Sequence, residues 1–141
     1  MPNEQTIKTA RALIDAVHAK DLSLWQRLLA DNFMAKYPGA AGLNRVQAYA
    51  YNQSFLDASD DIRFEVHRVI GDADWITFVC TASATLSRTL ITPAATFPGT
   101  GKSAQTPFVL IAQVKDGKIV AEQTVWNQLE VFQQWGILPA G

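Results

Sequence analysis

The hydrophobic pattern of the chain changes its period once, near Asp61, and this change limits the folds that the chain can adopt. In residues 4–19, apolar side chains recur at the spacing of one helical face: Ile7, Ala10, Ile14 and Val17. After Asp61, apolar residues alternate with polar ones, as in a half-buried strand: Ile62, Phe64 and Val66. Helices in the first part and strands in the second predict an α+β domain.

Three helices are expected before this change. The first covers residues 4–19, the second runs from Asp21 or Ser23 to Leu29, and the third runs from Asn44 to about Asp57. Asp, Ser and Asn are favoured at helix N-termini because their side chains accept hydrogen bonds from the first turn. Residues 37–42, rich in Gly and Pro, are predicted to form a loop between the second and third helices.

The rest of the chain is expected to form a curved antiparallel sheet. In order, the pattern predicts a strand from residue 61, a turn over residues 71–74, a strand from Trp75 to about Leu90, a loop over 91–102, strands over 103–115 and 118–128, and a short helix over 129–134.

The dipeptide Asp116-Gly117, between two long apolar runs, predicts a hairpin with a two-residue turn. If Lys115 pairs with Lys118, a regular ladder fixes the other pairs. One face then carries Val114 with Ile119, Ala112 with Ala121, Leu110 with Gln123, Phe108 with Val125, and Thr106 with Asn127. This face is apolar near the turn and polar at its far end, which is typical of a core that continues into a ligand pocket.

The opposite face of the same hairpin carries more apolar side chains than a solvent-exposed face normally does. It carries Val109, Ile111, Val120 and Trp126. An apolar patch of this kind usually marks association, so we expect a subunit contact there and a homodimer.

Composition excludes several classes of partner. The 141 residues suit one domain, residues 1–141, and they carry 12 Lys and Arg against 13 Asp and Glu, a net charge of −1. Nucleic-acid binding is not expected, because it favours a basic surface. Membrane insertion is not expected, because no apolar run approaches roughly 18 residues. The N-terminal residues do not resemble a signal peptide, so a cytoplasmic location is expected.

Cofactor motifs are weak. The stretch from Gly99 to Ser103 resembles a phosphate-binding loop, but Thr96 stands where such a loop needs a glycine, and a strand is expected to follow it rather than a helix. The two histidines, His18 and His67, are far apart in sequence, and no Cys and His spacing suggests zinc. The single Cys80 lies in an apolar run and is expected to be a buried, inert thiol.

Several stretches together resemble one family: Tyr37-Pro38-Gly39-Ala40-Ala41-Gly42, residues 55–58, 71–74 and 99–102, Asp116-Gly117-Lys118-Ile119-Val120-Ala121-Glu122, and residues 127–136. Their order and spacing are similar to the SnoaL-like polyketide (ester) cyclases of the nuclear transport factor 2 superfamily. The resemblance covers nearly the whole chain as a single SnoaL-like domain. It implies a cone-shaped barrel with three N-terminal helices packed on a curved antiparallel sheet, a homodimer, a deep apolar pocket and no cofactor or metal.

The resemblance also implies a chemistry. The cyclases of this family close a ring by an intramolecular aldol reaction, with an aspartate as acid and base where this chain has Asn127. An amide can hydrogen-bond a carbonyl or a developing enolate, but it exchanges no useful proton. Asn127 and Gln123 are therefore expected to polarise the substrate carbonyl. The base is left open between Asp31, His18, His67 and the acidity of the substrate itself.

Three functions stay open at this point. The first is a cofactor-free cyclase, isomerase or related lyase that acts on a hydrophobic polyketide- or terpenoid-like molecule. The second is a protein that binds a small hydrophobic molecule without chemistry. The third is water addition, which needs paired aspartates and an arginine that the inward positions do not offer. The expected substrate-binding residues are Tyr37, Tyr51, Phe55, Thr106, Phe108, Leu110 and Val125.

Overall fold

Each of the four helices begins at an Asn or Asp whose side chain accepts a backbone N–H from the first turn. In the computed structural model, which describes residues 3–139, these helices are α1 (Glu4–His18), α2 (Leu22–Arg27), α3 (Arg45–Ala58) and α4 (Gln128–Gln134). They confirm the predicted helices with small differences at their ends. Within residues 3–139, no helix is long and apolar enough to cross a membrane.

Six strands form one curved sheet in the order β2-β1-β8-β7-β4-β3. Their bounds are β1 (Leu29–Tyr37), β2 (Ala40–Leu43), β3 (Arg63–Asp72), β4 (Trp75–Thr85), β7 (Ser103–Lys115) and β8 (Lys118–Trp126). Neighbouring strands are antiparallel except β1 and β8, which are parallel. The short β5 (Leu90–Ile91) and β6 (Thr96–Phe97) pair separately inside the stretch expected as a loop and strand end.

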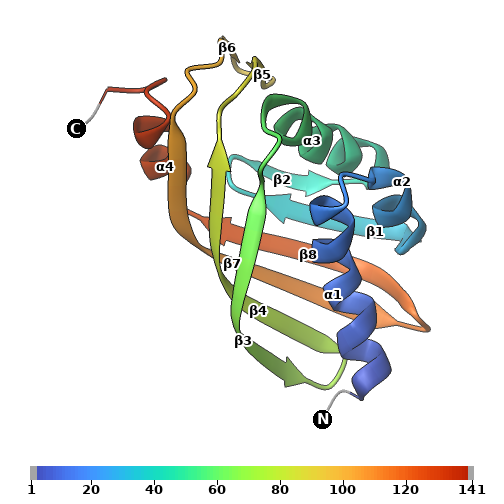
Figure 1. Ribbon diagram of the computed structural model, residues 1–141. Helices are drawn as coiled ribbons and strands as arrows, with labels where there is room; N and C mark the ends of the chain where they lie inside the picture. The colour runs from blue at the N-terminus through green and yellow to red at the C-terminus, as the bar shows by residue number, and fades with distance from the viewer. Residues whose placement is uncertain (1–2, 140–141) are drawn as a thin grey trace.

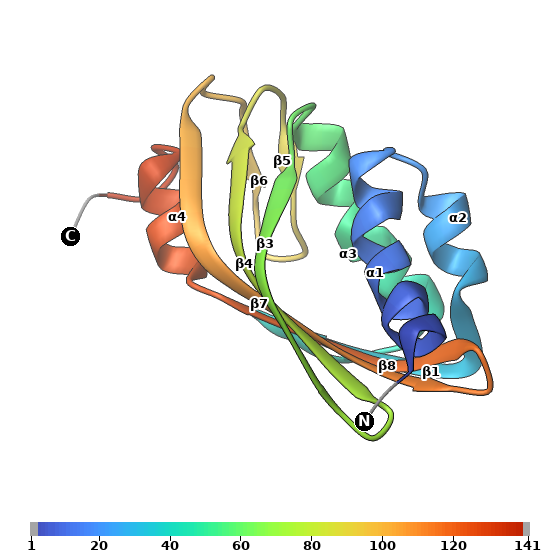
Figure 2. The same ribbon diagram turned by 60° about the horizontal axis from the view of Figure 1, so that its bottom comes forward.

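The helices and the sheet confirm the α+β fold. Helices α1, α2 and α3 lie together on one side of the sheet, and α4 lies at its other end beside β7 (Figures 1 and 2). The sheet bends around the space between these two groups (Figure 2). The largest fully buried side chains include Trp25 of α2, Phe33 of β1 and Phe78 of β4, so the main core lies between the first helices and the sheet.

The loop expected over residues 37–42 is instead a second hairpin. Tyr37 pairs with Ala40 across the turn made by Pro38 and Gly39, and Gly39 has a φ of 77°. A Pro followed by a residue of positive φ suits a tight turn, which glycine adopts without strain. The consequence is that β1 and β2 lie between α2 and α3 in the chain, and that Tyr37 enters the sheet beside β8.

The predicted register of the last hairpin is correct only next to its turn. Lys115 pairs with Lys118 and Val114 with Ile119, but Gln113 then pairs with Ala121, so Val120 is an extra residue in β8. The pairing of β8 with β1 shifts at the same place. A bulge of one residue sends every later side chain to the opposite face of the sheet. Glu122, Thr124 and Trp126 therefore point inward, where Gln123 and Val125 were expected.

Candidate functional site

A cavity lies between α3, the bent sheet and α4. Its volume is about 110 Å³, and the empty space is about 760 Å³ when the mouth that opens to solvent is included. None of the 18 residues that line it is charged, and seven of them are aromatic: Tyr37, Tyr51, Phe55, Phe64, Phe108, Trp126 and Trp135. Such a wall favours a neutral, apolar, ring-containing ligand.

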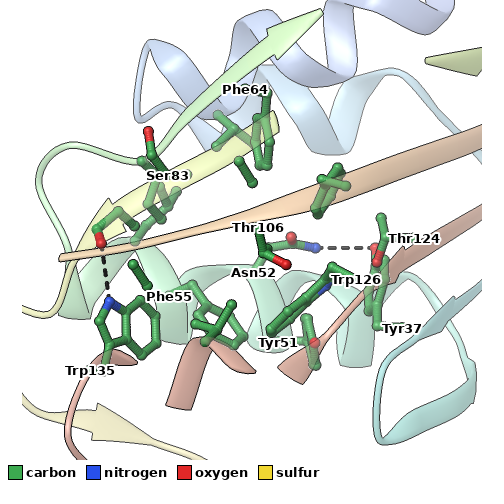
Figure 3. A pocket seen from close by; sticks show the side chains of 18 residues that line it. Tyr37, Tyr51, Asn52, Phe55, Phe64, Ser83, Thr106, Thr124, Trp126 and Trp135 are labelled. Carbon is green, nitrogen blue, oxygen red and sulfur yellow. Dashed lines mark hydrogen bonds between the residues drawn. The ribbon is translucent and has the colours of Figure 1, made fainter. Parts of the chain in front are cut away.

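The aromatic wall is held by ring-to-ring packing. The rings of Phe55 and Trp126 pack in a T-shaped arrangement, with their centroids 5.9 Å apart (Figure 3). The rings of Phe55 and Tyr51 are tilted to each other, with their centroids 5.3 Å apart. The indole N–H of Trp135, the residue that follows α4, donates to the carbonyl oxygen of Ala84 at 3.0 Å. This hydrogen bond holds the Trp135 ring against the end of β4. Because the indole dipole is satisfied in this way, Trp135 presents only apolar surface to the cavity.

One end of the cavity is polar. The hydroxyl of Tyr37 donates to Oε1 of Glu122 at 2.5 Å. It also accepts a hydrogen bond from Nδ2 of Asn52 at 3.1 Å, which Figure 3 shows as a dashed line. Nδ2 of Asn52 also donates to the carbonyl oxygen of Ala48 at 2.9 Å. Both protons of this amide are thus used within the protein, whereas its Oδ1 accepts no hydrogen bond from residues 3–139. Tyr37 and Asn52 line the cavity, so Asn52 offers a free acceptor to a ligand.

Glu122 lies behind Tyr37 and is 6% exposed. Its partners across the sheet are Ala35 of β1 and Ala112 of β7, whose small side chains leave room for the carboxyl group. Burial raises the pKa of Glu122 to about 7, and the hydrogen bond from Tyr37 only partly offsets this effect. Burial and the neighbouring Glu122 together raise the pKa of Tyr37 well above its ordinary value, so Tyr37 stays a neutral phenol.

Most of the expected substrate-binding residues line the cavity: Tyr37, Tyr51, Phe55, Thr106 and Phe108. Two do not. Leu110 is buried in the core, and Val125 points outward with 51% of its surface exposed, because the bulge reverses its side of the sheet. The same reversal brings Trp126, expected on the outer face, into the cavity wall.

The residues expected to polarise the substrate lie elsewhere. Gln123 is exposed and pairs with Ile111 on the outer side of the sheet. Asn127 is the N-cap of α4, and its Oδ1 accepts the N–H of Glu130 at 3.0 Å. Neither belongs to the residues that line the cavity. The register that placed both at the polar end of the cavity was wrong, because it lacked the bulge at Val120.

The expected bases also lie outside the cavity. Asp31 is exposed and 3.4 Å from Arg45, and Nε2 of His18 accepts the backbone N–H of Phe64. His67 is exposed and hydrogen-bonded to Thr81. Cys80 is buried and unpaired, as expected. Among residues 3–139, no group of three or more His, Cys, Asp or Glu side chains is placed to hold a metal ion.

The sequence offers a signal for one of the residues that the prediction missed. Ala48, Tyr51, Asn52 and Phe55 follow one another at the spacing of a single helical face, so Asn52 shares the side of α3 that carries the two aromatic rings. Glu122 has no such signal, because its inward position depends on the bulge.

The fold agrees with comparisons to known proteins. A family model for the SnoaL-like domain matches residues 10–122. The chain belongs to the SnoaL-like family. No curated protein matches this SnoaL-like chain.

Solved structures share its fold at low sequence identity. IdmH from Streptomyces antibioticus, a candidate polyketide cyclase, is 21% identical with a TM-score of 0.77, over 94% of this chain and 99% of that chain. AclR from Streptomyces galilaeus, a candidate hydroxylase, is 18% identical with a TM-score of 0.81, over 97% of this chain and 84% of that chain. A candidate SnoaL-like polyketide cyclase from Jannaschia sp. CCS1 is 16% identical with a TM-score of 0.82, over 96% of this chain and 94% of that chain.

Proposed function

We propose that this SnoaL-like protein is a cofactor-free enzyme of the cyclase and isomerase type, which acts on a hydrophobic polyketide- or terpenoid-like small molecule. The observation that carries the proposal is the hydroxyl of Tyr37, which lies at one end of an uncharged aromatic cavity and is backed by the buried carboxyl group of Glu122. Reactions of this type move protons to and from carbonyl compounds, and an acid in a dry pocket favours them.

The aromatic wall supports the choice of ligand class. A flat ring system can stack on Phe55 and Trp126 while its oxygen meets Tyr37 and Asn52. The absence of charge among the lining residues disfavours a free carboxylate or phosphate, because a buried charge without a partner is costly.

Proton transfer is testable without the natural substrate. The bicyclic ketone 2-tetralone, incubated with the protein in deuterated water, is expected to exchange its α-protons faster than in buffer alone, as followed by proton NMR. Tyr37→Phe is expected to abolish this increase in the rate of exchange over buffer, which is the gain that the protein provides. Tyr49→Phe removes a hydroxyl from a tyrosine that packs against the core outside the cavity, and it is expected to keep the gain. Exchange equal to that in buffer, for the unaltered protein, would contradict an enzyme of this type.

The second candidate is a protein that holds a small hydrophobic ligand without chemistry. The observation that favours it is the position of Asn127, which caps α4 where the related cyclases are expected to carry a catalytic aspartate. Trp126 and Trp135 line the cavity, so their fluorescence reports binding independently of turnover. Binding of 2-tetralone without proton exchange would support this candidate over the enzyme.

We also propose a homodimer that forms through the outer face of the sheet. Val79, Val109 and Val125 lie in register across β4, β7 and β8 on this face. Nearby, Trp75 is 42% exposed and Ile70 is 49% exposed. A second copy of the chain, with the same row of side chains, would remove this apolar surface from water.

A further inference from the structure

We propose that Tyr37 is the acid that contacts the ligand, and that Glu122 behind it stores the proton that Tyr37 exchanges with a ligand oxygen. The ligand class that fits such a pair is a neutral ring compound whose oxygen alternates between ketone and enol or phenol. This inference rests on the proposed function, because it assigns the acid of the same cavity.

The geometry makes Tyr37 the only link between Glu122 and the cavity among the described lining residues. Glu122 is not among the residues that line the cavity, whereas Tyr37 is, and their side-chain oxygens are 2.5 Å apart. Asn52 holds the Tyr37 oxygen from the other side at 3.1 Å. A proton that leaves Glu122 toward the ligand must therefore pass through the Tyr37 oxygen.

The pair has two protonation states that present opposite hydrogen-bonding groups. When Glu122 is ionised, Tyr37 donates to it, and the remaining lone pair of the Tyr37 oxygen accepts from a ligand O–H. When Glu122 is protonated, it donates to the Tyr37 oxygen, and the Tyr37 proton turns to a ligand carbonyl. In both states Asn52 keeps its hydrogen bond to Tyr37. The cavity is thus matched to an enol or phenol in the first state and to a ketone in the second.

The proton step balances within this set of groups. Aldol closure starts from the enol form of the ligand: the electron pair of its C=C bond forms the carbon–carbon bond, its O–H bond breaks and releases the proton to solvent at the mouth of the cavity, and the electron pair of the attacked C=O bond moves onto its oxygen. The Tyr37 O–H bond breaks as its proton goes to that oxygen, and the Glu122 O–H bond breaks as its proton restores the Tyr37 hydroxyl. The product is an alcohol beside an ionised Glu122, which regains a proton from solvent in exchange for product.

Among residues 3–139, the one hydrogen bond to the carboxyl group of Glu122 comes from Tyr37. The elements that pack against Glu122 bring Tyr37 of β1, Tyr51 of α3, and the alanines Ala35 and Ala112 of β1 and β7. Burial and the charge of Glu122 raise the pKa of Tyr51, so it stays neutral. The pKa of Glu122, about 7, responds to burial and to Tyr37, and to no cation. The switch between the two states is therefore expected near neutral pH.

The first test compares two ligands with the same carbon skeleton. Calorimetry measures the affinity of 2-tetralone, a ketone, and of 2-naphthol, a phenol, from about pH 5.5 to about pH 8. The affinity for 2-tetralone is expected to fall roughly tenfold with rising pH, as a donor is lost, and the affinity for 2-naphthol is expected to rise. Affinities with the same pH dependence for both ligands would overturn the inference while leaving binding itself intact.

Substitutions separate proton storage from mere packing. Glu122→Gln can still donate to the Tyr37 oxygen, so it is expected to bind 2-tetralone with the low-pH affinity at every pH. Glu65→Gln makes the same change at an exposed carboxylate and is expected to keep the pH dependence of the unaltered protein. A Glu122→Gln protein that retains that dependence would overturn the inference, because another group would then be titrating.

A second measurement needs no ligand. Infrared difference spectra between low and high pH are expected to show a protonated carboxylic acid that disappears near neutral pH and is absent in Glu122→Gln. If the chain bound neither test ligand, the proposed function would fail, but this band would still report whether Glu122 stores a proton. A Glu122 that is already ionised at about pH 5.5 would overturn the inference.

Discussion

The hydroxyl of Tyr37 and the carboxyl group of Glu122 form a buried hydrogen bond between residues 85 positions apart in the chain. Tyr37 ends β1, and Glu122 follows the bulge in β8, so the contact exists only because these strands are neighbours in the sheet. Glu122 is buried, with Ala35 and Ala112 as its partners on the neighbouring strands, and ionising its carboxyl group there opposes folding. The stability of the fold is therefore coupled to the protonation of this one side chain.

The first prediction is a loss of stability with rising pH that depends on Glu122. Its pKa is about 7 in the fold, above its ordinary value of 4.5. Folding therefore gains most from the protonated form at low pH, and this contribution is lost as pH rises through the folded pKa. The free energy of unfolding should fall by about 2 to 3 kcal/mol between about pH 5 and about pH 8 through this group.

Urea denaturation at the two pH values measures this loss. In Glu122→Gln, the free energy of unfolding should no longer show this loss between the two pH values. Glu65→Gln makes the same change at an exposed carboxylate and should show the same loss as the unaltered protein. A loss unchanged by Glu122→Gln would mean that the buried carboxyl group does not titrate in this range.

The second prediction concerns the hydroxyl of Tyr37. Tyr37→Phe leaves the carboxyl group of Glu122 without its donor and one proton of Asn52 without its acceptor. A buried polar group left unpaired costs about 1–3 kcal/mol, so unfolding should become easier by that amount. Tyr49→Phe removes a hydroxyl from a half-buried ring for which no hydrogen bond is seen among residues 3–139, and its effect should stay below about 0.5 kcal/mol. Equal effects of the two substitutions in denaturation would contradict the assigned pairing.

The third prediction concerns Asn127, whose side chain caps α4. Asn127→Ala should lower the free energy of unfolding by about 1 kcal/mol, because the N–H of Glu130 loses its acceptor. Asn127→Asp should keep the cap and leave stability within about 0.5 kcal/mol. Neither change should alter the pH dependence of ligand binding, because the side chain is exposed and does not line the cavity. A new pH dependence in Asn127→Asp would mean that this position reaches the ligand.

The sequence predicts the parts of the structure that depend on neighbouring residues better than the parts that depend on contacts between distant strands. Local patterns were sufficient for the second and third helices, since Asp21 and Asn44, both expected as caps, lie at their N-termini. Part of the aromatic wall was also expected, namely Tyr51, Phe55 and Phe108, whereas Trp126 was expected on the outer face. The polar end did not follow from local patterns, because an extra residue at Val120 leaves no mark in them, yet it exchanges Glu122 for Gln123 on the inner face. A bulge reflects packing between strands, which no short window of sequence contains.

The missed hairpin of β1 and β2 has a different cause. Phe33, Ala35 and Tyr37 are buried and alternate with exposed Met34 and Lys36, so the period of two was present in the sequence. The preceding helix and the Gly-rich turn obscured it, because a strand flanked by Pro-Gly looks like the edge of a loop. Tyr37 was nevertheless expected at the pocket, and β1 is the element that brings it there.

The last prediction concerns self-association through the outer face. Val109 lies between Val79 and Val125 in one row across three strands, and a lysine there would place a charge inside the proposed contact. We expect the unaltered protein to be a dimer at micromolar concentration by light scattering, and Val109→Lys to be a monomer with unchanged circular dichroism. Val46→Lys makes the same change on α3, away from that face, at a side chain that is 72% exposed, and it should stay dimeric. A monomeric unaltered protein would contradict the dimer, and an equal loss of dimer in both variants would place the contact elsewhere.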